Sequence, residues 1–387
     1  MKKANRLTMV FMAAMLSGMA ILPITNAVAE TKPPLKFGVA LPMSGPEALF
    51  GADQVTAQQW AVDDINASGG VDGHPLEMIA LDTQANPQLG INAVNRLINV
   101  DKVPALVTSW SSVVKAVAPI ANREKVIEFS VGANSPDIAE LGDYVYTVFP
   151  LADVDVTALA KYTHDVLKKE KAAILYINND SGIPGARIYR KIFEEAGGKV
   201  VSYEAYDPKT TDFTSLVLQV KAANPDIIHI HGLVGDLPQL VAQIRQLGLT
   251  QRISTYSIGF NPKVIEQLGD AAEGLIVTSL SPGVNDNENM PAYIERWMKN
   301  YNRVPNGMPY TQYNYDTPYI IAELYRWVLK NNLPITGENM RKALLDIKSF
   351  ELPLTGYVTF SDDHRVLKPV YLLTVENGKF EPLATIN

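Results

Sequence analysis

Two short segments that follow predicted strands carry side chains suited to binding a small carboxylate. Trp110-Ser111-Ser112 follows a strand that ends near Val107 and precedes a predicted helix. Hydroxyl groups beside a helix N-terminus, where backbone N–H groups have no partner within the helix, can hold such an anion. The alternative is an ordinary helix cap, because Ser is a favoured N-cap residue. Gly132-Ala133-Asn134-Ser135, after the next strand, poses the same choice, and two adjacent turns of this kind strengthen the binding interpretation.

A pair of histidines offers a second kind of chemistry. His229 and His231 are two residues apart on a predicted strand, so their side chains point to one face, and a metal site is one interpretation. The chain has no cysteine, and the spacing of other residues suggests no third ligand, so we expect no metal. We expect His231 to lie beside a cleft at the carboxyl end of its strand and His229 to be structural.

The sequence carries no signature of nucleotide binding and no catalytic constellation that we recognise. The turn Leu41-Pro42-Met43-Ser44-Gly45-Pro46 has neither the GxGxxG spacing nor the Lys-Ser/Thr pair of a phosphate-binding loop. No HExxH or GxSxG motif occurs. We therefore expect no cofactor and no catalytic residues. An enzyme on the same fold stays open as an alternative, which turnover of a captured compound would support.

The elements that must position these residues alternate between apolar runs of strand length and longer segments of helical period. This alternation is typical of parallel sheets with helices on both faces, so the predicted fold class is α/β. A strand at 35–42 and a helix at 51–66 begin the first half, which ends with a strand at 144–148. The pattern restarts at 172–177 and continues to 275–278, as expected for a second doubly wound lobe. Because open parallel sheets bind ligands at the carboxyl ends of their strands, two facing lobes predict a cleft.

The N-terminus has the pattern of an export signal. An apolar run at 7–24 follows three basic residues and is followed by the small-x-small site Ala27-Val28-Ala29. A permanent anchor helix is the alternative, but Pro23 and the polar Thr25-Asn26 cut the run short of a span of roughly 20 residues. We expect residues 1–29 to be a signal peptide cleaved after Ala29 and the mature protein to lie in the periplasm.

Composition excludes several further classes. The absence of cysteine excludes disulfides, thiol nucleophiles and a lipid-modified cysteine. Removing the basic residues of the signal, Lys2, Lys3 and Arg6, would take the formal net charge from −7 to −10, which argues against nucleic acid as a partner. Residues 30–387 are enough for two domains.

An ordered set of short segments resembles the branched-chain amino acid binding proteins, a type I periplasmic binding protein family. No segment is diagnostic alone, but the order is specific and spans nearly all of the mature chain. The segments are Leu41-Pro42-Met43-Ser44-Gly45-Pro46, Phe50-Gly51, Asp64-Ile65-Asn66-Ala67, Gly69-Gly70-Val71-Asp72-Gly73, Trp110-Ser111-Ser112, Ala118-Pro119, Asp212-Phe213-Thr214, Ala272-Glu273-Gly274 and Tyr315-Asp316.

The resemblance implies two Rossmann-like, doubly wound lobes joined by three hinge crossovers. We place the crossovers near Pro150, Pro282 and Phe360, so that the N-terminal lobe comprises 30–150 plus 283–360 and the C-terminal lobe 151–282 plus 361–387. It also implies that the lobes close on a small ligand and that the loaded, monomeric protein docks to the membrane permease of an ABC importer. A sensor that presents its ligand to a membrane receptor stays open as a further class.

Carried over residue by residue, the resemblance places the carboxylate-binding Ser of the family on Ser111. An Ala/Thr pair after the fourth strand falls on Gly132 and Asn134, and the aromatic residue of the first loop becomes Phe50.

In the second lobe the sequence departs from the pattern of the family. A ligand-covering Tyr aligns with Gly182, another aromatic with Leu233, and the acid that pairs with the α-ammonium of the ligand with Ile258. The last change removes the counter-charge of an ammonium, and an unpaired buried charge costs on the order of 3 to 5 kcal/mol.

The sequence therefore predicts capture of a carboxylate with an apolar or aromatic tail. The Ser111 hydroxyl, backbone N–H groups and Asn134 would hold the carboxylate, with Leu233, Ile258 and Ile183 around the tail. The remaining predicted lining residues are Phe50, Trp110, Ser112, Gly132, Gly182, His231 and Tyr310. Aromatic acids without an amine are the first candidates. The alternative is a branched-chain or other neutral amino acid whose ammonium meets carbonyl groups, Tyr256 or water.

Overall fold

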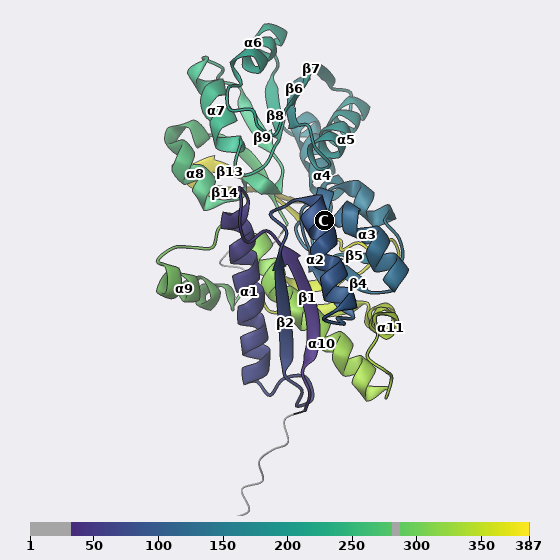
Figure 1. Ribbon diagram of the computed structural model, residues 1–387. Helices are drawn as coiled ribbons and strands as arrows, with labels where there is room; N and C mark the ends of the chain where they lie inside the picture. Colours follow the sequence, from purple (N-terminus) through teal and green to yellow (C-terminus); the bar gives the residue numbers. More distant parts are fainter. Residues whose placement is uncertain (1–31, 281–286, 387) are drawn as a thin grey trace, which may run out of the picture.

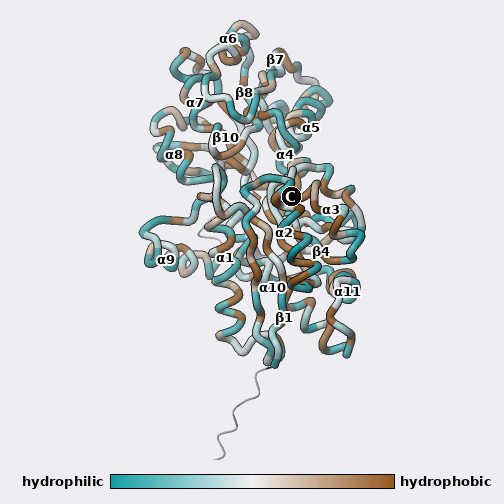
Figure 2. Tube along the Cα trace, viewed as in Figure 1, coloured by the Kyte–Doolittle hydropathy of each residue, from teal (hydrophilic) through white to brown (hydrophobic). Residues whose placement is uncertain are grey.

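The computed structural model describes residues 32–280 and 287–386 and divides them between two lobes built on separate sheets (Figure 1). The predicted signal peptide, its cleavage site after Ala29 and the crossover near Pro282 lie outside the described residues. Figure 2 shows hydrophobic residues along the central strands and hydrophilic residues on the outer turns and helix faces, as expected for sheets covered by amphipathic helices.

The N-terminal lobe contains a five-stranded parallel sheet in the order β2-β1-β3-β4-β5. Its strands are short apolar runs, and every residue of β3 and β4 is buried. The strands are β1 Leu35–Leu41, β2 Leu76–Asp82, β3 Ala105–Thr108, β4 Ile127–Ser130 and β5 Val145–Thr147. The segments between them form α1 Ala48–Ala67, α2 Pro87–Asn99, α3 Ser111–Glu124 and the 3-10 turn η1 Pro136–Glu140.

Later parts of the chain complete this lobe. The long helix α10 packs along α1, and α11 packs against α10. The added elements are α9 Met290–Tyr301, α10 Tyr310–Lys330, α11 Gly337–Ile347 and the antiparallel pair β11 Ser349–Leu352 and β12 Gly356–Thr359.

The C-terminal lobe contains a seven-stranded sheet in the order β14-β13-β10-β9-β8-β6-β7. The five strands from β6 to β10 are parallel, whereas β13 and β14 form an antiparallel hairpin at one edge. The strands are β6 Lys171–Ile177, β7 Lys199–Tyr206, β8 Ile227–His231, β9 Arg252–Thr255, β10 Ile276–Ser279, β13 Val370–Glu376 and β14 Lys379–Ile386. The helical elements are α4 Ala152–Asp165, α5 Gly182–Glu195, α6 Thr214–Ala223, α7 Leu237–Gln246, η2 Ser257–Gly259, α8 Pro262–Leu268 and η3 Gly269–Ala272.

The chain passes between the lobes three times. It leaves the first sheet after β5, returns from β10 to α9, and crosses again between β12 and β13. The predicted fold class, α/β with two lobes of parallel sheet, is confirmed. Because the parallel strands of each lobe end toward the other lobe, the loops that follow them face one another (Figure 1).

Candidate ligand-binding site

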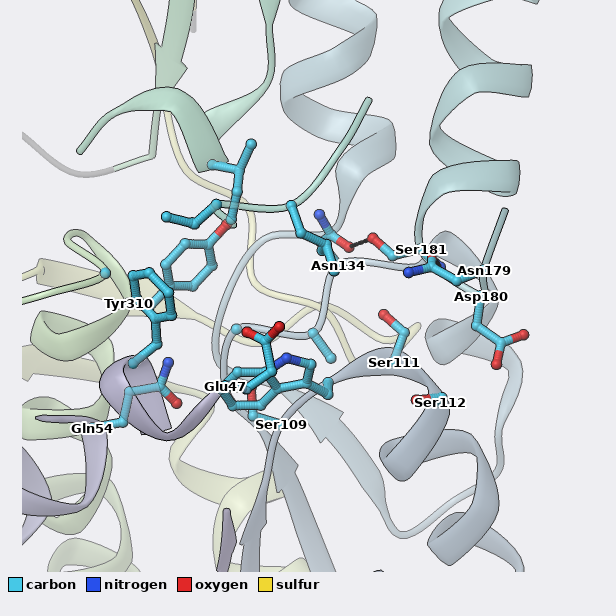
Figure 3. A pocket seen from close by; sticks show the side chains of 18 of the residues that line it. Glu47, Gln54, Ser109, Ser111, Ser112, Asn134, Asn179, Asp180, Ser181 and Tyr310 are labelled. Atoms are coloured by element: carbon cyan, nitrogen blue, oxygen red, sulfur yellow. Dashed lines mark hydrogen bonds between the residues drawn. The ribbon is translucent and has the colours of Figure 1, made fainter. Parts of the chain in front are cut away.

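A cavity of about 720 Å³, partly open to solvent, lies between the two lobes where these loops meet. The N-terminal lobe contributes Glu47, Phe50, Gln54, Ser109, Trp110, Ser111, Ser112, Gly132, Ala133, Asn134, Gly307 and Tyr310. The C-terminal lobe contributes Asn179, Asp180, Ser181, Leu233, Val234, Tyr256 and Ile258. Figure 3 shows Glu47, Ser111, Asn134 and Tyr310 around this space, whereas the Asp180 carboxylate is directed away from them.

Ser111 is the first residue of α3, and its side chain does not cap the helix. Trp110 occupies the N-cap position with φ 61° and ψ 117°, and no side-chain hydrogen bond caps the helix there. The Ser111 Oγ instead accepts a hydrogen bond from the Ser135 N–H at 3.2 Å. Its own proton is therefore available to donate, beside the N-terminal N–H groups of a 14-residue helix. This arrangement suits an anionic oxygen.

The turn after β4 links the lobes. Gly132 has φ +96°, and a Cβ there would lie 2.9 Å from Tyr310 Cδ1, so the glycine permits the ring to pack closely. The Asn134 Oδ1 accepts a hydrogen bond from the Ser181 Oγ of the other lobe at 2.6 Å. The Asn134 Oδ1 is therefore engaged by the other lobe. The N–H groups of the same amide can donate to a ligand or to Tyr256.

Two supported tyrosines line the cavity. The Tyr310 ring stacks on Phe149 with centroids 4.6 Å apart. The Tyr256 ring stacks on His231 at 4.0 Å, and its hydroxyl donates to the Gly232 carbonyl at 2.7 Å. These contacts hold both rings in fixed orientations, as a preformed binding wall requires.

A buried acid holds the loop that presents Ile258 to the cavity. The Asp155 carboxylate, in α4, accepts hydrogen bonds from the Ser257 N–H at 3.0 Å and from the Thr278 hydroxyl at 2.8 Å. Burial raises the pKa of Asp155 to about 6. Ile258 and Leu233 supply an apolar part of the lining.

An acid that the sequence interpretation did not include also lines the cavity. Glu47 directly precedes α1, and the nearby Trp110 indole acts to lower the pKa of its carboxyl group. Burial, and then the negative charge of Asp236 on the opposite lobe, raise the pKa of Glu47. Asp180 is a second acid of the lining, and no Lys, Arg or His occurs among the described residues that line the cavity.

The loop that carries Glu47 is held by the end of the neighbouring strand. The Asp82 Oδ1 accepts hydrogen bonds from the Met43 N–H at 2.8 Å and the Ser44 N–H at 3.3 Å, and Asp82 also binds the Ser44 hydroxyl. This anchor fixes the path of the chain between β1 and α1.

Nine of the twelve predicted site residues line the cavity, and three lie outside it: Gly182, Ile183 and His231. A Cβ at Gly182 would lie 1.9 Å from the Ile177 carbonyl oxygen, so no side chain could reach the ligand from there. Its neighbours Asp180 and Ser181 take that place. Ile183 is 42% exposed on the outer side of α5.

The prediction that His231 faces the cleft is wrong. His231 is fully buried behind Tyr256, and burial lowers its pKa to about 3, so the ring is neutral. His229 stacks on Tyr189 and contacts the Ser254 hydroxyl at 3.2 Å. Within the described residues, no group of three or more His, Cys, Asp or Glu side chains could hold a metal.

Charged residues form a second set of contacts between the lobes at the rim of the cavity. The Lys115 ammonium lies 3.1 Å from Asp137 of its own lobe and 3.7 Å from Asp180 of the other, and Arg187 lies 3.9 Å from Asp137. Ser112 and Lys115 have the spacing of an SxxK motif, but the Lys115 ammonium lies between the two carboxylates at the rim.

Ten lining residues were not among the predicted site residues: Glu47, Gln54, Ser109, Ala133, Asn179, Asp180, Ser181, Val234, Tyr256 and Gly307. Most follow the carboxyl ends of strands, so strand ends alone could have indicated them. Gln54 and Gly307 are exceptions, because they depend on how α1 and the loop before α10 approach the cleft.

Two sheet lobes around a cleft lined by polar loop residues define the class of bilobal solute-binding proteins. The chain belongs to the Periplasmic binding protein family, whose family model matches residues 34–379. The resemblance stated from the sequence is therefore confirmed. No helix within residues 32–280 and 287–386 is long and apolar enough to cross a membrane.

Individual proteins agree with this assignment. The chain is 27% identical over 299 residues to the Leu/Ile/Val-binding protein of Escherichia coli, covering 76% of each chain. The fold matches a leucine-binding protein of Thermotoga maritima with a TM-score of 0.81 at 24% identity, over 91% of this chain and 99% of that one. It also matches a solute-binding protein of an ABC transporter from Rhodopseudomonas palustris, solved with 3,4-dihydroxybenzoic acid, with a TM-score of 0.81 at 19% identity, over 92% and 97%.

Proposed function

We propose that this protein is the periplasmic receptor of an ABC importer and captures a small carboxylate with an apolar or aromatic tail by closing its lobes. The observation that carries the proposal is Ser111, whose hydroxyl proton is available at the N-terminus of α3 inside the cleft. A hydroxyl and several backbone N–H groups can hold a carboxylate without a cationic side chain.

The apolar part of the cavity suits the rest of such a ligand. Leu233 and Ile258 lie on the second lobe, while Phe50, Trp110 and Tyr310 line the first. Both kinds of ligand named for the relatives, a branched-chain amino acid and a dihydroxybenzoic acid, combine a carboxylate with an apolar body. The apolar lining therefore suits an aromatic or aliphatic acid and the side chain of an apolar amino acid equally.

Glu47 favours a second candidate. Ile258 stands where the family pattern places the acid that pairs with an ammonium, so the second lobe offers no acid at that position. Glu47 supplies a carboxylate from the first lobe instead, so a counter-charge for an ammonium is present in the cavity.

We further propose that residues 1–29 are removed on export, that the mature protein is a monomer in the periplasm, and that an inner-membrane permease accepts its ligand. The same cleft would also serve a protein that presents its ligand to a sensor.

A thermal-shift screen tests the receptor function. The purified protein is stripped of bound solute by unfolding and refolding and then melted with amino acids, aromatic acids, aliphatic acids and the corresponding amides. A ligand at 100 times its dissociation constant stabilises the folded protein by about 2.7 kcal/mol, which raises the melting temperature measurably. A shift with carboxylates and none with amides is expected, and a shift with amides alone would contradict the carboxylate site.

Ser111→Ala tests the residue that carries the proposal. Loss of a charge-assisted hydrogen bond of about 1.5 to 3 kcal/mol should weaken binding of the carboxylate found in the screen by roughly 10- to 150-fold in calorimetric titration. Ser68→Ala is the matched control, because the Ser68 hydroxyl only contacts the Asp64 carbonyl on the exposed end of α1. Unchanged affinity in Ser111→Ala would place the carboxylate elsewhere.

A further inference from the structure

We propose that Glu47 is a specificity-determining residue that pairs with an ammonium group of the ligand, so that the captured solute is a carboxylate that also carries an amine. This inference rests on the proposed function, because it assumes that the ligand occupies the cavity between the lobes.

Glu47 lies where its carboxylate can contact a ligand. Figure 3 shows the Glu47 carboxylate directed into the middle of the cavity, with Tyr310 on one side and Ser111 on the other. The Trp110 indole lies near this carboxylate and acts to lower its pKa. A carboxylate can accept about four hydrogen bonds, so much of its capacity remains for a donor of the ligand.

The charges around Glu47 favour a cationic group on the ligand. Asp236, directly before α7, acts on Glu47 through its negative charge. The other titratable side chains of the lining are Asp180, before α5, and the hydroxyls of Tyr256 and Tyr310, and none of these groups is cationic. Lys115 lies beside Asp180 at 3.7 Å and offsets that charge, but it is engaged at the rim. A ligand with only a carboxylate would bring a further negative charge next to Glu47, which is unfavourable in a partly buried site. An ammonium would instead pair with it.

The arrangement also places both polar contacts of the ligand on one lobe. Ser111 and Glu47 belong to the N-terminal lobe, whereas Leu233 and Ile258 on the opposite lobe are apolar. The polar head of the ligand would therefore bind the N-terminal lobe first, and closure would cover its tail. In the pattern carried over from the family, by contrast, the ammonium is paired from the second lobe at the position that is Ile258 here.

Matched pairs of compounds test the inference. Leucine and 4-methylpentanoate share a carbon skeleton and differ by the amine, as do phenylalanine and 3-phenylpropanoate. Calorimetric titration of the wild type should show tighter binding of the amine-bearing member of a pair, by at least 10-fold. Equal or tighter binding of the amine-free acid would overturn the inference.

Glu47→Gln should reduce the affinity for the amine-bearing compound by at least 10-fold. The ratio of affinities between the amine-bearing and the amine-free compound of each pair should fall as well. Glu77→Gln, on the edge strand β2 outside the cavity lining, is the control for the loss of one negative charge. The melting temperature of each variant without ligand verifies folding. If Glu47→Gln and Glu77→Gln bind the amine-bearing compound equally, Glu47 does not contact the amine.

The pH dependence separates the two kinds of ligand independently. Burial raises the pKa of Glu47 above its usual 4.5, and an ammonium beside the carboxylate would lower it again, so binding should release a proton and affinity should rise as the pH rises above 4.5. A simple acid beside Glu47 would give the opposite slope and overturn the inference. If Ser111→Ala leaves all affinities unchanged, the proposed carboxylate site itself fails, which is a different result from loss of the amine preference alone.

Discussion

The side chains that line the cavity are suited to neutral hydrogen bonding more than to ion pairing. Among the described lining residues the donors are hydroxyls, amides and an indole, and the two charged groups are acids. Six first-lobe residues of the site could be predicted from strand ends and from the order of segments that the family resemblance covers: Phe50, Trp110, Ser111, Ser112, Gly132 and Asn134. Glu47 was missed because its charge lies in a turn, where a solvated acid is the ordinary expectation.

Glu128 is a buried acid that the proposed function does not use. It lies in the middle of β4, is fully buried, and accepts a hydrogen bond from the Thr108 hydroxyl at 2.7 Å. Burial raises its pKa to about 8, so the folded protein favours the neutral acid. The stability that this group contributes is therefore complete below its unfolded pKa of 4.5 and is lost as the pH rises toward 8.

We predict that Glu128→Gln stabilises the protein at neutral pH. At pH 7 the ionisation penalty of the buried acid is about 3 kcal/mol, from about 1.4 kcal/mol for each unit of pKa, and a neutral amide removes it. Urea unfolding at pH 4.5 and pH 7 measures the effect, which should be present only at the higher pH. An equal change at both pH values would mean that ionisation of Glu128 is not the cause.

At the scale of elements, the turn after β4 is the most constrained part of the site. Its Gly132 combines a positive φ with close contact to the Tyr310 ring. Gly132→Ala is therefore expected to destabilise the protein by about 1 to 3 kcal/mol and to weaken ligand binding by displacing Tyr310.

Gly235→Ala is the control for Gly132→Ala, because a Cβ at Gly235 meets nothing within 4 Å. Thermal unfolding and calorimetric titration of both variants should separate them clearly. Similar behaviour of the two variants would show that the close approach of Gly132 and Tyr310 is unimportant.

The regular alternation of strands and helices could be predicted from the sequence, but several elements could not. Helix α4 was missed because Asp155 occupies a buried position and interrupts the apolar pattern of that helix. The edge strand β14 was missed because most of its residues are exposed, and the hairpin it forms with β13 makes the second sheet mixed instead of parallel. Both α4 and β14 depend on tertiary contacts, which the local periodicity of the sequence does not reveal.

At the scale of the whole molecule, the lobes are joined across the cavity by contacts of different character. The Ser181–Asn134 hydrogen bond is buried, whereas the Arg187–Asp137 pair is exposed. Buried hydrogen bonds contribute about 0.5 to 1.5 kcal/mol, and exposed ion pairs contribute little. The buried contact should therefore dominate the free energy of closure.

We predict that Ser181→Ala weakens binding by roughly 2- to 10-fold, because the closed form loses that contact. Arg187→Ala, which removes the exposed cross-lobe pair, is the comparison and should change affinity by less than about 2-fold. Calorimetric titration of both variants with one carboxylate checks the order. A larger effect from Arg187→Ala would assign closure to the charged rim.

The most direct test of the proposed binding mode is a crystal structure of the protein with a carboxylate identified by the thermal-shift screen. We predict that the carboxylate lies within hydrogen-bond distance of the Ser111 Oγ at the start of α3, with the ligand tail against Leu233 and Ile258. A ligand bound elsewhere would contradict this prediction, for example in a separate cavity lined by Phe260, Ile265 and Phe380.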